Sequence, residues 1–86
     1  MYYVYVLVSE LDNKFYTGST PDLKGRFAEH CDGKVISTRN RRPLRLIYYE
    51  ASLGAKADAI RRERYIKSGM GKRYLRNRLK AQLGAL

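Results

Sequence analysis

The sequence has 86 residues, and its 18 Lys and Arg against eight Asp and Glu give a net charge of +10. Hydrophobic residues make up 44% of the chain, which argues against a disordered protein, and no apolar run approaches the ~20 residues of a membrane-spanning helix. The single cysteine, Cys31, excludes an internal disulfide, and the charge favours a polyanionic partner such as DNA, RNA or an anionic membrane surface.

The N-terminal part of the chain predicts a β-hairpin. Residues 2–8 are β-branched and aromatic, residues 9–13 are polar and turn-like, and residues 14–19 predict a second strand. The first segment lacks the basic leader and the small-residue cleavage site of a signal peptide, so we expect a cytoplasmic protein. An even-numbered hairpin loop places one set of side chains on a common face of the sheet: Tyr3, Tyr5, Leu7, Tyr16 and Gly18.

A first helix and a third strand follow. Thr20 is a predicted N-cap and Pro21 suits the first helical position, so a helix is expected from there to about Asp32. Residues 35–42 predict a basic loop. Residues 43–50 predict a strand in which Leu44, Leu46 and Tyr48 alternate with Arg45 and Ile47.

Two further helices complete the predicted order. Ser52 can cap a helix over residues 53–67, Ser68-Gly69 ends it, and a third helix is expected over residues 72–83. The order predicts a small α+β fold, a three-stranded antiparallel sheet flanked by about three helices, in a single domain over residues 1–86.

Polar residues interrupt the apolar stripes of the first two predicted helices. His30, with Arg26 one turn before it, lies in a stripe formed by Leu23, Phe27 and Cys31. Glu63 lies in a stripe formed by Ala59, Ile60 and Ile66. The structural interpretation is a half-buried histidine with satisfied hydrogen bonds, and a salt bridge between Glu63 and an arginine of another element. The functional interpretation is that these side chains belong to a site.

Tyrosine is an ordinary strand residue, but two of the eight tyrosines are candidate functional residues because they share a predicted face of the sheet. If Tyr5 and Tyr16 face Arg26, His30 and Glu63, one sheet face carries two phenols, a guanidinium, an imidazole and a carboxylate. This set is typical of a phosphodiesterase, in which a base, a phosphate clamp and a metal ligand are needed.

The same residues, in this order and spacing, resemble the GIY-YIG nuclease superfamily. The two motifs read Tyr3-Val4-Tyr5 and Tyr16-Thr17-Gly18, with Tyr3 in place of the usual glycine, and Arg26, His30 and Glu63 follow at the family's positions. Residues 38–43 and the strand after them are similar to small stand-alone bacterial members, which are related to the N-terminal nuclease domain of the bacterial repair excinuclease. The resemblance covers nearly the whole chain.

The resemblance implies roles for these residues. Glu63 would hold one Mg²⁺ or Mn²⁺ ion, and Arg26 would clamp the scissile phosphate. Tyr5 is our choice of general base, relaying its proton through His30, with Tyr16 as the alternative base or the residue that orients the water. Asn77 is an accessory candidate near the metal. A lone Cys31-His30 pair cannot complete a zinc site, so zinc is not expected.

A basic surface supports a nucleic-acid partner. Between residues 56 and 80 there are ten Lys and Arg against two acids. Contacts of such residues with phosphates carry no sequence information, so little sequence specificity is expected. The candidates for nucleic-acid binding are Lys24, Arg39, Arg41, Arg42, Arg62, Lys67, Lys72 and Arg73.

The expected function is therefore a metal-dependent endonuclease that hydrolyses DNA phosphodiester bonds, with roles such as DNA repair or recombination. DNA is favoured over RNA, no small-molecule cofactor or membrane is expected, and a protein partner could supply targeting. Two alternatives stay open: a non-catalytic nucleic-acid-binding module that retains the nuclease fold, and an interaction domain that docks on an acidic complex.

Overall fold

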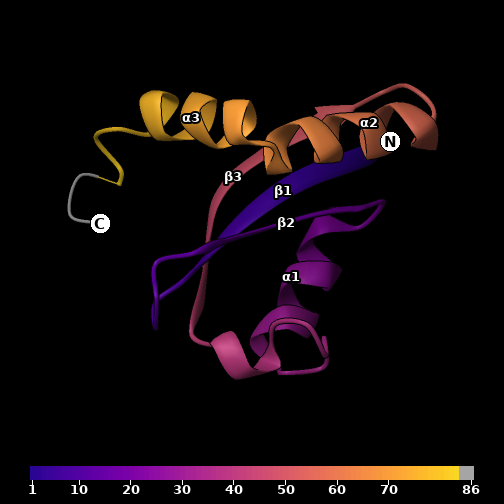
Figure 1. Cartoon of the computed structure of the whole chain (residues 1–86). Coiled ribbons are helices and arrows are strands. Elements are labelled where there is room, and N and C mark those ends of the chain that lie inside the picture. The colour runs from indigo at the N-terminus through magenta and orange to yellow at the C-terminus, as the bar shows by residue number, and fades with distance from the viewer. Residues whose placement is uncertain (84–86) are drawn as a thin grey trace.

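The three strands form one antiparallel sheet with helices on both faces. The computed structural model describes residues 1–83. The sheet has the order β2-β1-β3. Figure 1 shows α1 on one side of the sheet and α2 and α3 on the other, which confirms the predicted α+β fold. The elements are β1 (Tyr2–Ser9), β2 (Phe15–Thr20), α1 (Leu23–Cys31), the 3₁₀ turn η1 (Arg39–Arg41), β3 (Leu44–Ser52), α2 (Lys56–Lys67) and α3 (Gly69–Arg78).

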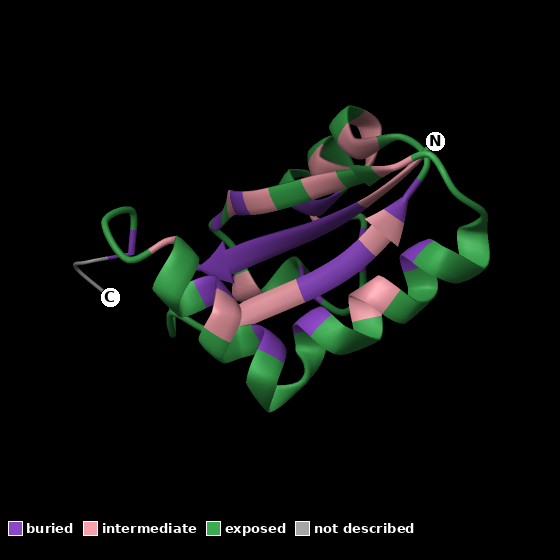
Figure 2. Ribbon diagram, turned by 90° about the horizontal axis from the view of Figure 1, so that it is seen from above, coloured by how far each residue is buried: buried purple, intermediate pink, exposed green. Residues whose placement is uncertain are grey.

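The central strand β1 divides the core into two layers, and Figure 2 shows it buried along most of its length. Successive side chains of a strand point to opposite faces. Val4, Val6 and Val8 therefore pack toward α2 and α3, where Ile66 and Leu75 are buried. Tyr5 and Leu7 pack on the opposite face, with side chains of α1 and β3. Both faces of β1 are thus covered, and any polar group there needs a hydrogen-bond partner.

The hairpin register agrees with the prediction. Tyr5 is directly opposite Gly18, and Leu7 is directly opposite Tyr16. Between β1 and β3, however, the register shifts, so that Val6 pairs with Tyr48 while Leu7 pairs with Leu46. One residue, Ile47, is the extra residue of a β-bulge.

The bulge changes which side chains share a face of β3. The expected alternation of Leu46 and Tyr48 is wrong, because the extra residue Ile47 places Tyr48 against the α2 and α3 layer. Tyr49 then faces the α1 side, where its ring meets Tyr3 edge to face with ring centroids 6.2 Å apart.

The first helix begins later than predicted. Asp22, not Thr20, is the N-cap of α1, and its Oδ1 accepts a hydrogen bond from the Gly25 backbone N–H at 3.1 Å. Thr20 remains in β2, and its hydroxyl oxygen accepts a hydrogen bond from the Asp22 N–H at 3.1 Å. Thr20 therefore ends the strand, and Asp22 starts the helix.

The other two helices also depart from the prediction at their ends. Ser52 belongs to β3 rather than capping α2, which begins at Lys56. Ser68 joins the last two helices, since it ends α2 and its Oγ accepts a hydrogen bond from Gly71 N–H at 3.1 Å. Because that cap suffices to start a new helix, α3 begins three residues before the predicted Lys72 and ends at Arg78.

The segment over residues 35–42, predicted as a basic loop, contains a 3₁₀ turn and buried side chains. Val35 and Thr38 are buried, and the chain forms the turn η1. The Ser9 hydroxyl donates a hydrogen bond to the Arg41 carbonyl oxygen at 2.7 Å, which ties this segment to the end of β1. Across residues 1–83, none of the helices has the length and apolar character needed to cross a membrane.

Candidate active site

A buried chain of three polar side chains connects β1, α1 and the segment before η1. The Tyr5 hydroxyl is hydrogen-bonded to Nε2 of His30 at 2.8 Å, and Nδ1 of His30 is hydrogen-bonded to Oγ1 of Thr38 at 2.7 Å. His30 and Thr38 are fully buried, and Tyr5 nearly so. Both ring nitrogens of His30 are therefore occupied, and the imidazole is held in one orientation.

Burial keeps both members of the Tyr5–His30 pair neutral. Burial raises the pKa of the Tyr5 phenol, although the nearby Arg26 guanidinium acts in the opposite direction. Burial lowers the pKa of His30, and the positive charge of Arg26 lowers this pKa further. A neutral imidazole can accept a proton at one nitrogen, so His30 is available as an acceptor for Tyr5.

The Tyr5 ring lies over Gly18, and the glycine makes room for it. A Cβ at position 18 would lie 2.5 Å from the Tyr5 hydroxyl oxygen and 2.7 Å from Cζ. Any other residue at position 18 would therefore displace the phenol. The second motif thus contributes to the site through the absence of a side chain on β2.

Arg26 and Tyr16 border the buried pair. Arg26 is one helical turn before His30 on α1, and its interaction with Tyr5 raises the pKa of the guanidinium. Arg26 also forms an exposed ion pair with Glu29 at 3.4 Å. The Tyr16 ring packs edge to face on the His30 ring with centroids 5.2 Å apart, and its hydroxyl receives a long hydrogen bond of 3.4 Å from Ser37.

Glu63 approaches this group from the other side of the sheet. It belongs to α2, which packs on the Val4 face, so the expectation that all five side chains share one sheet face is wrong. Its Oε1 accepts a hydrogen bond from Ser19 of the edge strand β2 at 2.8 Å. Its negative charge nevertheless makes a small contribution to the raised pKa of Tyr5.

The ion-pair partner of Glu63 is also not the expected one. Oε2 of Glu63 lies 2.7 Å from Nζ of Lys67, one turn later on the same helix, rather than near an arginine of another element. The Lys67 side chain is 52% exposed, whereas Glu63 is only 20% exposed. The carboxylate therefore already binds a cationic group, and that group can move into solvent.

The donor set fits one hard divalent cation at Glu63. Residues 1–83 contain no group of three or more His, Cys, Asp or Glu side chains placed to hold a metal together. A single carboxylate completed by phosphate oxygens and water is a normal arrangement for Mg²⁺. Cys31 is exposed, and Asn77 is exposed near the end of α3, which Figure 1 shows extending away from α2.

A second feature is a polar groove of about 680 Å³ at the other end of β2. Four cationic side chains line it, and Asp12 is its one acid. The Arg76 guanidinium lies 4.9 Å from the centre of the Phe15 ring, and Arg41 donates a hydrogen bond to the Lys14 carbonyl oxygen at 3.2 Å. We call this the basic groove; its lining residues are Asp12, Asn13, Lys14, Phe15, Arg41, Lys72 and Arg76.

The other cations predicted to bind nucleic acid have different surroundings. Arg62 is paired with Glu50, and its guanidinium lies 5.1 Å from the Tyr65 ring centre. Its positive charge therefore interacts with groups of the protein itself. Arg42 donates a hydrogen bond to the Arg39 carbonyl oxygen at 2.9 Å. Lys24 borders a separate apolar groove beside α1, and Arg39 and Arg73 are exposed.

The sequence did not predict several side chains that contact the candidate catalytic residues, namely Ser19, Glu29, Ser37 and Thr38, and it assigned Lys67 to nucleic-acid binding rather than to the ion pair with Glu63. The spacing of Lys67, four residues after Glu63, was a readable signal. Ser19 follows a motif residue on an edge strand, but nothing in its surroundings marks it. Thr38 lies in a segment predicted as a loop, where a buried threonine has no periodic pattern to reveal it.

Comparison with known proteins gives consistent matches. The family model of the GIY-YIG catalytic domain matches residues 1–78. A UPF0213 protein of Staphylococcus haemolyticus is 41% identical over 68 residues, covering 78% of this chain and 80% of that protein. A UPF0213 protein of Halobacterium salinarum is 43% identical over 68 residues, covering 78% and 86%. A third, from Lacticaseibacillus paracasei, is 43% identical over 67 residues, covering 77% and 73%. No solved structure matches this chain.

Proposed function

The chain belongs to the GIY-YIG catalytic domain family, with UPF0213 proteins as relatives, and from this premise we propose that it is a divalent-metal-dependent endonuclease. Membership of the family implies nuclease-like activity on nucleic acid. Our proposal is narrower: hydrolysis of DNA phosphodiester bonds with little sequence specificity, in DNA repair or recombination.

The Tyr5–His30 hydrogen bond is the observation that carries the proposal. A buried phenol 2.8 Å from a neutral imidazole is more than a core contact needs, because burying two polar groups is costly. The same phenol lies over Gly18 of the edge strand β2 and interacts with Arg26, the cation that we propose binds phosphate. A core-filling tyrosine would need neither neighbour.

In the proposed mechanism Arg26 binds the scissile phosphate through its planar fork of N–H donors. The tautomer needed is the one with the His30 proton on Nδ1, donated to Thr38 Oγ1, so that Nε2 accepts from Tyr5. As the attacking water gives a proton to the Tyr5 oxygen, the phenol proton passes to Nε2. The negative charge of the phosphate would raise the pKa of His30 and so favour this transfer.

Glu63 is the proposed ligand of one Mg²⁺ or Mn²⁺ ion, in exchange for the ammonium of Lys67. When bound, the ion supplies positive charge where the leaving oxygen develops negative charge. Ser19, on the edge strand β2, holds one oxygen of this carboxylate by a hydrogen bond of 2.8 Å. The protein's own contribution at this point is to fix one carboxylate oxygen and leave the other for the cation.

The basic groove gives the DNA backbone a path away from the site. Phe15 lines the groove, and it is followed along β2 by Tyr16 and Gly18, so both features border one strand. Lysine and arginine contacts with phosphate bind without reading bases, which is the reason that we propose low sequence specificity.

The test is nicking of supercoiled, single-stranded and branched DNA with Mg²⁺ or Mn²⁺. We expect Glu63→Gln and Arg26→Ala each to reduce the nicking rate by about a hundredfold or more, since each removes a charge from the transition state. The matched control is Glu10→Gln, which removes an exposed carboxylate next to the end of β1 and should leave the rate near wild type.

Nicking that survives both substitutions would contradict the proposal, because the activity would then belong to another nuclease. Binding of DNA without nicking by the wild-type chain would support the alternative, a non-catalytic module. The ion pair between Lys67 and Glu63 is the observation that favours that alternative, so Lys67→Ala is a useful companion variant. If the chain is an enzyme, this variant should bind Mg²⁺ at least as well as wild type.

A further inference from the structure

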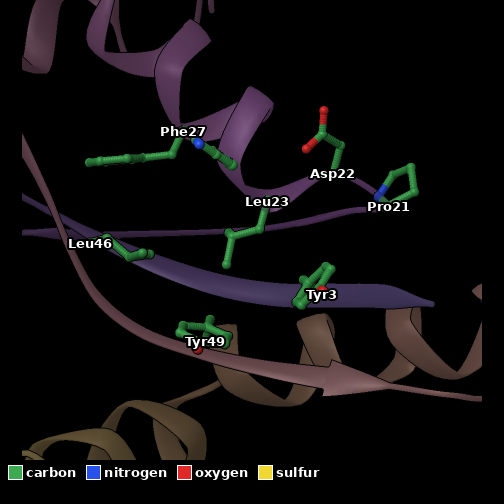
Figure 3. Close-up of a pocket in the computed structure, with 8 residues that line it drawn as sticks. Tyr3, Pro21, Asp22, Leu23, Phe27, Leu46 and Tyr49 are labelled. Carbon is green, nitrogen blue, oxygen red and sulfur yellow. The ribbon is translucent and has the colours of Figure 1, made fainter.

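An apolar groove of about 510 Å³ lies between α1 and the strands β1 and β3. Figure 3 shows Leu23 and Phe27 on the helix side and Tyr3, Leu46 and Tyr49 on the strands. The proposed mechanism uses none of these side chains. The groove is lined by Tyr3, Pro21, Asp22, Leu23, Lys24, Phe27, Leu46 and Tyr49.

One aromatic residue of the groove, Tyr49, is open to solvent, whereas Tyr3 and Phe27 are half-buried. The Tyr49 side chain belongs to the edge strand β3, and the residue is 55% exposed. Its ring meets Tyr3 at an interplanar angle of 61° rather than stacking face to face, so the flat face of a ring is left for another planar group. An exposed large aromatic residue beside a groove is a better sign of binding than a buried one.

The groove lies beside the candidate active site. Tyr49 is the direct cross-strand partner of Tyr5, and Tyr3 is two residues before Tyr5 on the same face of β1. On the helix, Leu23 and Phe27 are three residues before and one residue after Arg26. A nucleic-acid strand whose phosphate is bound by Arg26 therefore reaches this groove with its adjoining nucleotide.

We propose that this groove binds an unpaired nucleobase of the strand that is held at the site. A nucleobase is a flat aromatic group attached to a phosphate, and the groove combines tyrosine and phenylalanine rings with Lys24 at its border. The net charge of +10 favours a nucleic acid over an apolar peptide as the occupant. A base stacked inside a duplex cannot enter without unpairing. The inference rests on the proposed function and narrows its substrate to DNA with unpaired bases, such as bulged, branched or single-stranded DNA.

The test measures binding rather than cleavage, in buffer with a metal chelator. Two duplexes of one sequence are compared: one fully paired, and one with a single bulged 2-aminopurine whose fluorescence reports stacking. We expect wild-type protein to quench the bulged base and to bind the bulged duplex about tenfold more tightly than the paired one, as one base–aromatic stack allows.

Tyr49→Ala should abolish both the quenching and the preference while leaving affinity for the paired duplex unchanged. Tyr49→Phe keeps the ring and should keep both. Tyr65→Ala removes another partly exposed tyrosine, from α2 on the other side of the sheet, and should behave as wild type. A melting curve of each variant checks that it is folded.

A wild-type protein that binds both duplexes equally, or a preference that survives Tyr49→Ala, would overturn the inference. A change from dimer to monomer in Tyr49→Ala, with the preference retained, would also overturn it and assign the groove to self-association. The base preference is measured without metal, so it can hold even if the chain proves unable to cut. In that case the nuclease proposal fails and the base-binding groove stands.

Discussion

The hydroxyl of Tyr5 lies 2.8 Å from Nε2 of His30, and both side chains are buried between β1 and α1. A phenol in this position has a fixed acceptor for its proton. Tyr16 contacts the same imidazole only through its ring, with centroids 5.2 Å apart. The two tyrosines of the motifs are therefore not equivalent, and the hydrogen bond assigns the proton relay to Tyr5 in our proposal.

Tyr5→Phe should reduce the nicking rate by about a hundredfold or more, the usual effect of losing a general base. Tyr16→Phe removes a hydroxyl whose one described contact is the 3.4 Å bond from Ser37, so its effect should be several-fold at most. Each variant is assayed for nicking and for its melting temperature. Tyr5→Phe should lose about 1 kcal/mol of stability with its hydrogen bond, which is too little to unfold the chain. The reverse order of rates would make Tyr16 the base.

The pH dependence of the rate follows from the directions of two pKa shifts. The pKa of His30 is lowered from 6.5, so the imidazole remains a neutral acceptor below that pH and the rate should show no break there. The pKa of Tyr5 is raised above 10.0, so the phenol stays protonated from pH 5.5 to 9 and can relay its proton throughout; the rate should stay nearly constant, whereas a tenfold rise per pH unit would indicate that the phenolate is the reactive form. The measurement is the rate with saturating metal from pH 5.5 to 9. A plateau that begins near pH 6.5 would instead indicate a solvent-exposed histidine as the base.

Gly18→Ala should inactivate the site without a catalytic group being removed. The new methyl group would lie 2.5 Å from the Tyr5 hydroxyl oxygen, and the phenol has to move away from His30 to relieve the overlap. We expect a stability loss of about 1–3 kcal/mol, typical of overpacking, with a rate loss similar to that of Tyr5→Phe. Gly69→Ala is the matched control, because a Cβ there meets nothing within 4 Å. An active Gly18→Ala would mean that the Tyr5 position is not needed for catalysis.

The parts of the site that were predictable are those set by short-range periodicity. A strand repeats every two residues, so Tyr5 and Gly18 could be placed on one face from the hairpin alone. A helix brings residues four apart to one side, so Arg26 and His30 could be paired in the same way. Neither relationship depends on how distant elements pack.

The position of Glu63 depended on which sheet face α2 covers, and helix periodicity does not contain that information. Its stripe correctly predicts that Ala59 and Ile66 are buried but is wrong for Ile60, which is exposed. The two buried residues pack against Val4 and Val6 rather than against Tyr5. The bulge at Ile47 could not be predicted for a related reason. Ile47 and Tyr48 are both good strand residues, and the sequence does not decide which face of the sheet each side chain covers. Asp22 and Thr20 are both good caps, and only the length of β2 decides between them.

Acid should destabilise the fold through an ion pair that joins β3 to α2. Burial by itself would raise the pKa of Glu50, but hydrogen bonds from Arg62 and Tyr48 hold it below the ordinary 4.5. Glu50 therefore stabilises the folded chain above its unfolded pKa, and this contribution is lost as the pH falls through the lower folded value. Glu50→Gln should lower the melting temperature at pH 7 and flatten its fall between about pH 5 and 3. Glu29→Gln, in an exposed pair, should leave that slope nearly unchanged.

The basic groove should determine the salt dependence of DNA binding. Lys72 and Arg76 line it together with Lys14 and Arg41, and each phosphate contact releases about one counterion when it forms. Lys72→Gln and Arg76→Gln should each reduce the slope of log affinity against log salt by about one, whatever the sequence of the DNA. Arg61→Gln is the control. This substitution removes the same charge from the chain, but Arg61 lies on α2, where it is paired with Asp58. If all three variants reduce the slope equally, the DNA responds to total charge and follows no defined path. If only the groove variants do so, the backbone leaves the site along β2.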